Sequence, residues 1–136
     1  MSTNKTKLVR LAAALALLGT ASFGAMAEWT QVTENPDIKA YVDFNTIRRS
    51  GHMVKMWTLN DEKSRQTSPS GSYLSMRSRD EYDCSDERKR KLDLSVHVER
   101  MAGGSVLYTD STIGQWTSIA PGSIAARFFE AACGIK

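Results

Sequence analysis

The sequence predicts an α+β domain in which a meandering antiparallel sheet of about six strands carries a C-terminal helix on one face. Two observations support this fold class. Most of the chain beyond residue 27 alternates between apolar and polar side chains with a period of two, and turn-forming residues separate these stretches. The end of the chain changes to the spacing of an amphipathic helix, which is too short to be stable unless it docks on the sheet.

The first half of the sheet is read from the segment before residue 72. Residues 38–45 alternate between apolar and polar side chains, and 49–51 read as a turn. Residues 53–59 are apolar on both sides, which is typical of a central strand covered on both faces. Proline, glycine, serine and threonine gather in 60–71, so we expect a polar loop there.

The second half of the sheet contains the clearest alternation. We expect the next strand over 73–79. In 92–99 the even-numbered residues are all apolar and the odd-numbered residues are all polar, so the two faces differ in character. Glycines at 103–104 predict a hairpin turn into a strand over 105–109, and 116–119 form a short last strand.

The C-terminal helix has a start signal and a stop signal. Ser123 follows a proline and a glycine and is the expected N-cap, while Gly134 is the expected C-terminal stop. The apolar stripe that we expect to pack on the sheet comprises Ile124, Phe128, Ala131 and Ile135.

Residues 1–27 read as a secretory signal peptide, with a basic start, an apolar run and a small-residue cleavage motif. The apolar part is short for a bilayer-spanning helix and is diluted by glycine and hydroxyl residues. We therefore expect cleavage between Ala27 and Glu28, and a single exported domain over 28–136 without a stable membrane span. No cysteine stands at the cleavage point, which argues against a bacterial lipoprotein.

The charge balance disfavours nucleic acid as a partner. The full sequence has 18 basic and 15 acidic side chains, but three of the basic ones precede residue 28. The expected mature chain is therefore neutral, whereas proteins that bind nucleic acid carry basic patches.

Both cysteines, Cys84 and Cys133, lie in the expected mature chain. An exported protein meets an oxidising compartment, so we expect one disulfide between them. It would close a loop of about 50 residues and stabilise the fold by roughly 3–4 kcal/mol. The alternatives are two free thiols or an intermolecular bridge.

Three blocks of residues follow one another along the expected mature chain. The first is Asp43-x-x-Thr46-Ile47-Arg48-Arg49-x-Gly51, continued by Val54-x-Met56-Trp57-x-Leu59-x-Asp61. The second is Tyr73-x-Ser75, then Glu81-Tyr82-Asp83-Cys84-x-x-Glu87-Arg88-x-Arg90-x-Leu92. The third is Trp116, then Pro121-Gly122-Ser123-Ile124, and it ends at Ala132-Cys133. In this order the blocks resemble the surface-adhesin protein E family.

The resemblance implies an exported protein with an antiparallel sheet backed by a C-terminal helix. The family is named for a lipid-anchored bacterial adhesin that binds host matrix and serum proteins such as vitronectin and laminin. By this resemblance we expect an adhesin-like, non-enzymatic binding module whose ligand is a protein or an anionic glycan, in the periplasm, at the cell surface or secreted. The alternative is a periplasmic protein that binds another envelope component and has no host contact.

The run of charges over 80–91 is one candidate binding site. Its basic end comprises Arg88, Lys89, Arg90 and Lys91, which would suit sulfated glycans or acidic proteins. If a strand begins near Arg88, Arg88 and Arg90 continue the inward face, and we expect one of them to be semi-buried and paired with Glu81, Asp43 or Asp83. Lys89 and Lys91 are then the better candidates. The alternative is a solvated loop whose charges pair with each other.

Aromatic residues give a second candidate. Tyr41 and Trp57 lie opposite the apolar positions of their strands, together with Met53 and Leu59. If the helix covers only one face, these side chains leave an apolar patch that would bind a partner or form a homodimer. The alternative is that the expected loop over 60–71, or the helix itself, covers this face.

Catalytic, metal and cofactor sites are not expected. His97 and Glu99 share a strand face, but two ligands do not make a metal site. His52 lies in a turn, and neither Ser75 nor Ser123 has a nucleophile motif around it.

Overall fold

The computed structural model describes residue 19 and residues 26–135, so most of the expected signal peptide lies outside the described residues. This part of the chain folds into seven strands and one helix. Among the described residues, no helix is long and apolar enough to cross a bilayer. In chain order the elements are β1 (Thr30–Glu34), β2 (Ile38–Ser50), β3 (Met53–Ser68), β4 (Gly71–Asp83), β5 (Arg88–His97), β6 (Val106–Asp110), β7 (Thr117–Ser118) and α1 (Ile124–Cys133).

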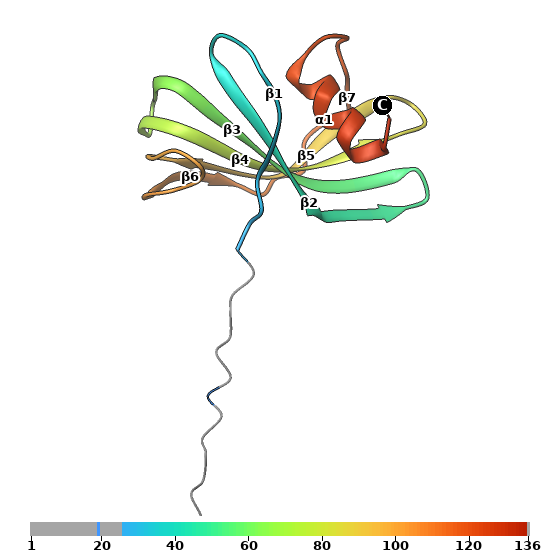
Figure 1. Ribbon diagram of the computed structural model, residues 1–136, viewed down its shortest axis with the longest axis horizontal. Coiled ribbons are helices and arrows are strands. Elements are labelled where there is room, and N and C mark those ends of the chain that lie inside the picture. The colour runs from blue at the N-terminus through green and yellow to red at the C-terminus, as the bar shows by residue number, and fades with distance from the viewer. Residues whose placement is uncertain (1–18, 20–25, 136) are drawn as a thin grey trace, which may run out of the picture.

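Six strands follow one another through the sheet in the order β1-β2-β3-β4-β5-β6, and each neighbouring pair is antiparallel (Figure 1). The short β7 pairs with the first residues of β5, whereas β6 pairs with its last residues. The antiparallel meander with a C-terminal helix agrees with the predicted α+β class. The sheet has one strand more than predicted. The additional strand is β1, an edge strand that is mostly polar and shows no apolar alternation in the sequence.

The prediction of a polar loop over 60–71 is wrong. β3 continues to Ser68 and β4 begins at Gly71, with a two-residue turn between them. The hairpin extends beyond the apolar core, where backbone hydrogen bonds hold the strands and side chains have no reason to alternate. The guanidinium of Arg100 supports this extension by donating a hydrogen bond to the backbone carbonyl of Glu62.

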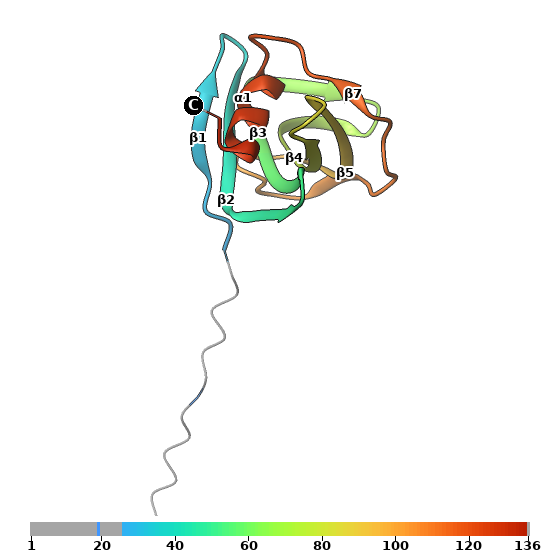
Figure 2. The same cartoon turned by 90° about the vertical axis from the view of Figure 1, so that its right-hand side faces the viewer.

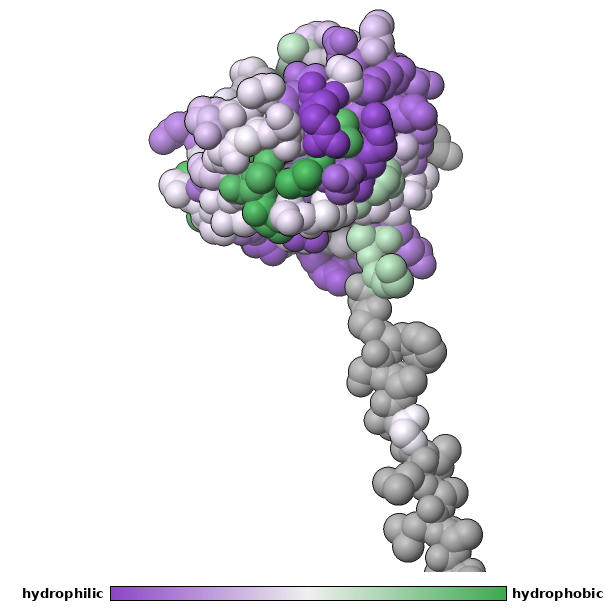
Figure 3. Space-filling model, turned by 90° about the vertical axis from the view of Figure 1, so that its left-hand side faces the viewer, coloured by the Kyte–Doolittle hydropathy of each residue, from purple (hydrophilic) through white to green (hydrophobic). Residues whose placement is uncertain are grey.

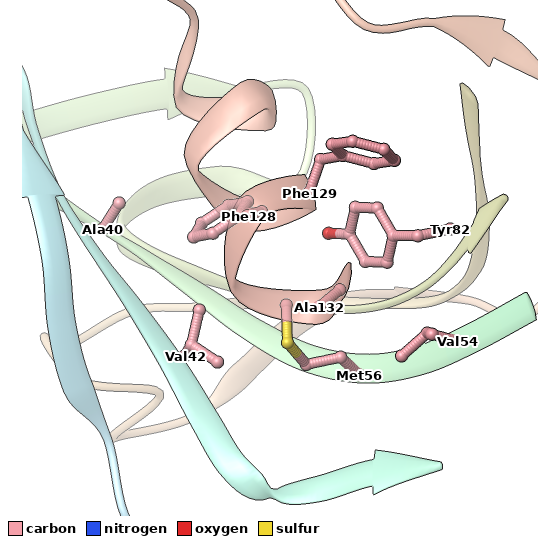
Figure 4. Packing of buried hydrophobic residues seen from close by; sticks show 8 residues of the cluster. All are labelled: Ala40, Val42, Val54, Met56, Tyr82, Phe128, Phe129 and Ala132. Carbon is pink, nitrogen blue, oxygen red and sulfur yellow. The ribbon is translucent and has the colours of Figure 1, made fainter. Parts of the chain in front are cut away.

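The main apolar core lies between α1 and the sheet that curves around it (Figure 2). Strands β2, β3 and β4 each contribute buried side chains, and α1 contributes two aromatic rings that point into the same space (Figure 4). Burial of these apolar side chains is the main force that holds the helix on the sheet. The buried cluster comprises Ala40, Val42, Val54, Met56, Tyr82, Phe128, Phe129 and Ala132.

Both ends of α1 are capped as the sequence predicts. The hydroxyl of Ser123 accepts a hydrogen bond from Ala126 N at 3.1 Å. Gly134 ends the helix with a φ of 70°, a left-handed conformation that favours glycine. Arg49 adds a contact from β2, since its guanidinium donates to the carbonyl of Ala132 at 3.3 Å.

The buried face of α1 is wider than the predicted stripe. Phe128 is buried as expected, and Ile124 and Ala131 are partly buried and pack against the core as expected. Phe129 and Ala132, which the predicted stripe does not include, are buried as well. Ile135 is 50% exposed because the helix has already ended at Gly134. The sheet wraps around α1, so a wider arc of the helix is buried than a single four-residue stripe provides.

The expected disulfide is present between Cys84 and Cys133. Cys84 directly follows β4, and Cys133 is the last residue of α1. The bond therefore joins the end of the helix to the strand on which it packs.

The polar face of β5 is buried at its C-terminal end, where the sequence predicts an exposed face. Ser95 and His97 are only 6% and 5% exposed. The segment after β5 folds back over this end of the sheet: Ser75 Oγ donates to the carbonyl of Glu99 at 2.5 Å and accepts from Ala102 N at 2.9 Å. The sequence pattern gave the alternation correctly but could not show that a loop covers the polar side.

Candidate functional site

The basic residues of the run 88–91 are all paired with acids. The pairs are Arg88–Asp83 at 3.0 Å, Lys89–Asp80 at 3.2 Å, Arg90–Glu81 at 2.6 Å and Lys91–Asp110 at 2.5 Å. Three of these pairs lie within the run, as the alternative expects, whereas Lys91 pairs with Asp110 outside it. The expected solvated loop is not formed, because Asp80–Asp83 belong to β4 and Arg88–Lys91 belong to β5. A role for these four residues in partner binding stays a prediction.

Trp116 covers the two arginines of this run. The guanidinium carbons of Arg88 and Arg90 lie 4.7 Å and 4.5 Å from the centre of its ring. Such stacking suits arginine, whose planar group can contact an aromatic face and a carboxylate at the same time. Each guanidinium therefore already has an ionic and an aromatic partner.

Two acids of this region have lowered pKa values. The hydrogen bond from Lys91 holds the pKa of Asp110 at about 2, and the backbone N–H of Thr112 contributes to this. The backbone N–H of Asp86, with the guanidinium of Arg88, holds the pKa of Asp83 below its usual value. Both carboxylates thus remain charged near neutral pH and keep their basic partners engaged.

A more open site lies around Trp57. A groove of about 740 Å³ runs between the start of the described domain and strands β2, β3 and β4. We call it the Trp57 groove. Two tryptophans and charges of both signs line it, so it offers apolar and ionic contacts together. Its lining residues are Met26, Ala27, Glu28, Trp29, Asp43, Asn45, Thr46, Arg48, Trp57 and Arg77.

Neighbouring strands fix the position of Trp57. Its backbone nitrogen donates to Thr46 Oγ1 at 3.0 Å. On the ring, the guanidinium carbon of Arg77 lies 4.7 Å and that of Arg79 lies 6.0 Å from the centre. The register places Trp57 opposite Arg79 on β4, so the stacking follows directly from strand pairing.

The two stacked arginines differ in their ionic partners. Arg79 pairs with Asp93 at 3.0 Å. Arg77 forms no ion pair with any described residue, and this is the difference between them, because the Nε atoms of both arginines are buried without a hydrogen-bond partner among the described residues. A guanidinium on an indole ring in an open groove is suited to a carboxylate supplied from outside.

The broad apolar patch expected opposite the helix is not formed. Leu59 is completely buried, and Tyr41, Met53 and Trp57 are half-buried. Tyr41 pairs with Leu59 across the sheet and does not line the Trp57 groove. The segment after β5 and the neighbouring charged side chains cover most of this face. Of the described side chains, only the indole of Trp57 remains accessible there, so no broad apolar patch is formed.

Sequence reasoning missed several residues of the Trp57 groove. The sequence patterns point to neither Trp29 nor Arg77, and they include Arg48 only within the first family block, although all three line the groove. The pairing of β3 with β4 could have revealed the arginines. In this register Trp57 lies opposite Arg79 and beside Arg77, so both guanidinium groups can reach the indole. Trp29 had no such signal, because the edge strand that follows it was not recognised.

A small apolar area also lies at the end of the molecule that carries β6 (Figure 3). This edge strand exposes Val106 and Tyr108 by 52% and 47%. Hydrophilic residues frame the area, and scattered apolar exposure of this size is ordinary for a protein surface.

The histidine and serine candidates have structural roles. His97 Nε2 lies 2.8 Å from Ser95 Oγ, and both residues are buried. Burial, with the nearby charge of Arg77, lowers the pKa of His97. Ser75 bonds the loop over β5 and Ser123 caps α1, so each hydroxyl is already engaged. Among residues 26–135, no group of three or more His, Cys, Asp or Glu side chains is arranged to hold a metal ion.

Comparisons with known proteins identify the family. The family model described as surface-adhesin protein E matches residues 29–134. The chain belongs to the surface-adhesin protein E family. A comparison with curated proteins finds no match.

Solved structures of Haemophilus influenzae protein E are similar to this family member. One has a TM-score of 0.60 with 12% identity, covering 82% of this chain and 87% of that chain. A second crystal form has a TM-score of 0.61 with 12% identity, covering 82% and 91%. At this level of identity the structures establish a shared fold.

Proposed function

We propose that the mature chain is an exported, non-enzymatic, adhesin-like module that binds a protein ligand through the Trp57 groove. Membership of the surface-adhesin protein E family and the fold shared with protein E support an adhesin-like role. We choose this groove as the binding surface because Arg77 stacks on Trp57 there and has no carboxylate partner among the described residues.

The lining of the groove indicates the chemistry of the ligand. Trp57 and Trp29 offer apolar contact area, and partly exposed aromatic residues and arginines are the residues that most often dominate protein interfaces. Arg77 would pair with an acidic side chain of the ligand. We therefore propose a protein segment that presents an aromatic or aliphatic side chain beside an aspartate or glutamate.

A protein ligand is favoured over an anionic glycan. The residues that would bind sulfate groups, Lys89 and Lys91, are held by Asp80 and Asp110. A glycan would have to displace these acids, whereas Arg77 has no competing acid to displace.

A charge substitution tests the groove. Arg77→Gln should weaken binding to immobilised matrix and serum proteins, with vitronectin and laminin as probes, and should flatten the dependence of binding on salt. Arg90→Gln is the matched control, because Arg90 also stacks on a tryptophan but already pairs with Glu81. Equal losses in the two variants would contradict a special role for Arg77.

Protease shaving tests the location. Intact cells and lysed cells are treated with protease, and an antibody against the mature domain detects the protein. Cleavage on intact cells is expected for an adhesin. Protection until lysis would contradict the adhesin role and favour a periplasmic protein that binds an envelope component.

A further inference from the structure

Asp43 differs from the other buried acids of the domain. It is 5% exposed. The remaining buried carboxylates belong to Asp61, Asp80, Glu81 and Asp83. Each of these four has an arginine or lysine nitrogen within 3.6 Å. Within the described chain no basic side chain pairs with Asp43, and burying a carboxylate without a cation is unfavourable.

Two backbone nitrogens approach the Asp43 carboxylate. Asn45 N donates to Oδ1 at 3.1 Å in a local turn. Glu28 N donates to Oδ2 at 3.2 Å, although it lies 15 residues earlier in the sequence. The Glu28 side chain holds this position as well, because its Oε2 accepts a hydrogen bond from Asn45 Nδ2 at 2.7 Å.

We propose that Asp43 is the binding site for the α-ammonium group that removal of the signal peptide creates on Glu28. Cleavage adds water across the Ala27–Glu28 peptide bond: the C–N bond breaks, Ala27 leaves as a carboxylate, and the nitrogen of Glu28 is protonated. That nitrogen already lies within hydrogen-bond distance of Asp43 Oδ2. The new ammonium group of Glu28 thus supplies the cation that the buried Asp43 carboxylate lacks.

The surroundings of the bond agree with this process. Met26 is 89% exposed, and Ala27 and Glu28 are also exposed, so a peptidase can reach the bond. Met26 and Ala27 line the Trp57 groove, so their removal also opens that end of the groove. The inference rests on the export step of the proposed function but needs no ligand.

Two chains that differ only at their start test the proposal. One begins at Glu28 with a free amino group, and the other retains Met26 and Ala27. The chain that begins at Glu28 should melt higher, by roughly 4 °C or more, because an ammonium replaces a neutral amide as the donor to Asp43. Equal melting temperatures would overturn the proposal, and this comparison needs no substitution that might unfold the domain.

Asp43→Asn in both chains makes the test specific. The asparagine cannot form an ion pair, so the difference between the two chains should disappear. A difference that persists unchanged would overturn the assignment to Asp43. Mass spectrometry of the exported protein should give Glu28 as the first residue, and any other first residue would also overturn the proposal, whatever the groove binds.

Discussion

The backbone N–H of Trp57 donates a hydrogen bond of 3.0 Å to the hydroxyl of Thr46. This bond lies where the pairing of β2 with β3 shifts register, between Asp43 and Arg48. The same hydroxyl donates to the carbonyl of Asp43 at 2.6 Å. The Thr46 side chain therefore connects β2 to β3 where the regular strand pairing is interrupted. It holds this part of β2, which lines the Trp57 groove, next to Trp57.

Thr46→Val should lower the free energy of unfolding by about 1–3 kcal/mol. Valine keeps the shape of the side chain but leaves the N–H of Trp57 without its partner, and an unsatisfied buried donor costs about this much. Urea unfolding of the two proteins measures the change. Thr46→Ser retains the hydroxyl and should lose less. A valine variant as stable as the serine variant would show that the hydrogen bond does not support the groove.

Replacing both cysteines by serine should lower the free energy of unfolding by roughly 3–4 kcal/mol, because the unfolded chain gains the freedom of the opened loop. Cys133 ends α1, so the helix should also loosen locally. Hydrogen exchange of the α1 amides, beside that of β3, measures this effect. An unchanged melting curve would contradict a structural role for the Cys84–Cys133 bond.

His97 should make the domain less stable in mild acid. Burial and the charge of Arg77 lower its folded-state pKa below the ordinary value for histidine, so the unfolded chain takes up a proton more readily than the folded chain does. Stability is therefore full above about pH 6.5 and falls as the pH drops from there toward the folded-state pKa. Melting temperatures from pH 7.5 to 5.5 measure this effect.

His97→Gln is the control for that titration, since glutamine keeps a polar group near Ser95 but does not titrate. The variant should show a flatter dependence on pH between 7.5 and 5.5. An identical dependence in the two proteins would assign the loss of stability to other groups.

Local signals in the sequence predicted the ends of α1 and the disulfide well. An N-cap needs only Ser123 and the residues after it, and a helix stop needs only Gly134. The disulfide required only two cysteines in one exported domain. Each of these features depends on chemistry that a few neighbouring residues, or simple counting, can specify.

Features that depend on strand register could not be predicted in the same way. The polar extension of the β3–β4 hairpin has no alternation, because neither of its sides packs on the apolar core. The contact of Arg77 with Trp57 requires knowing which residues of β3 and β4 face each other. The contact of Glu28 with Asp43 requires the path of the chain before β1. Each of these relationships joins residues that are distant in sequence.

In the proposed function, the indole of Trp57 contacts the ligand directly. Binding of the mature domain to immobilised vitronectin and laminin, compared between Trp57→Ser and Trp116→Ser, tests it most directly. Both tryptophans stack on two arginines, but only Trp57 lines the groove. Trp57→Ser should lose affinity at least about tenfold while keeping its fold, because it loses an interface anchor, whereas Trp116→Ser should lose little. Equal binding by the two folded variants, or no binding by the unsubstituted domain, would contradict it.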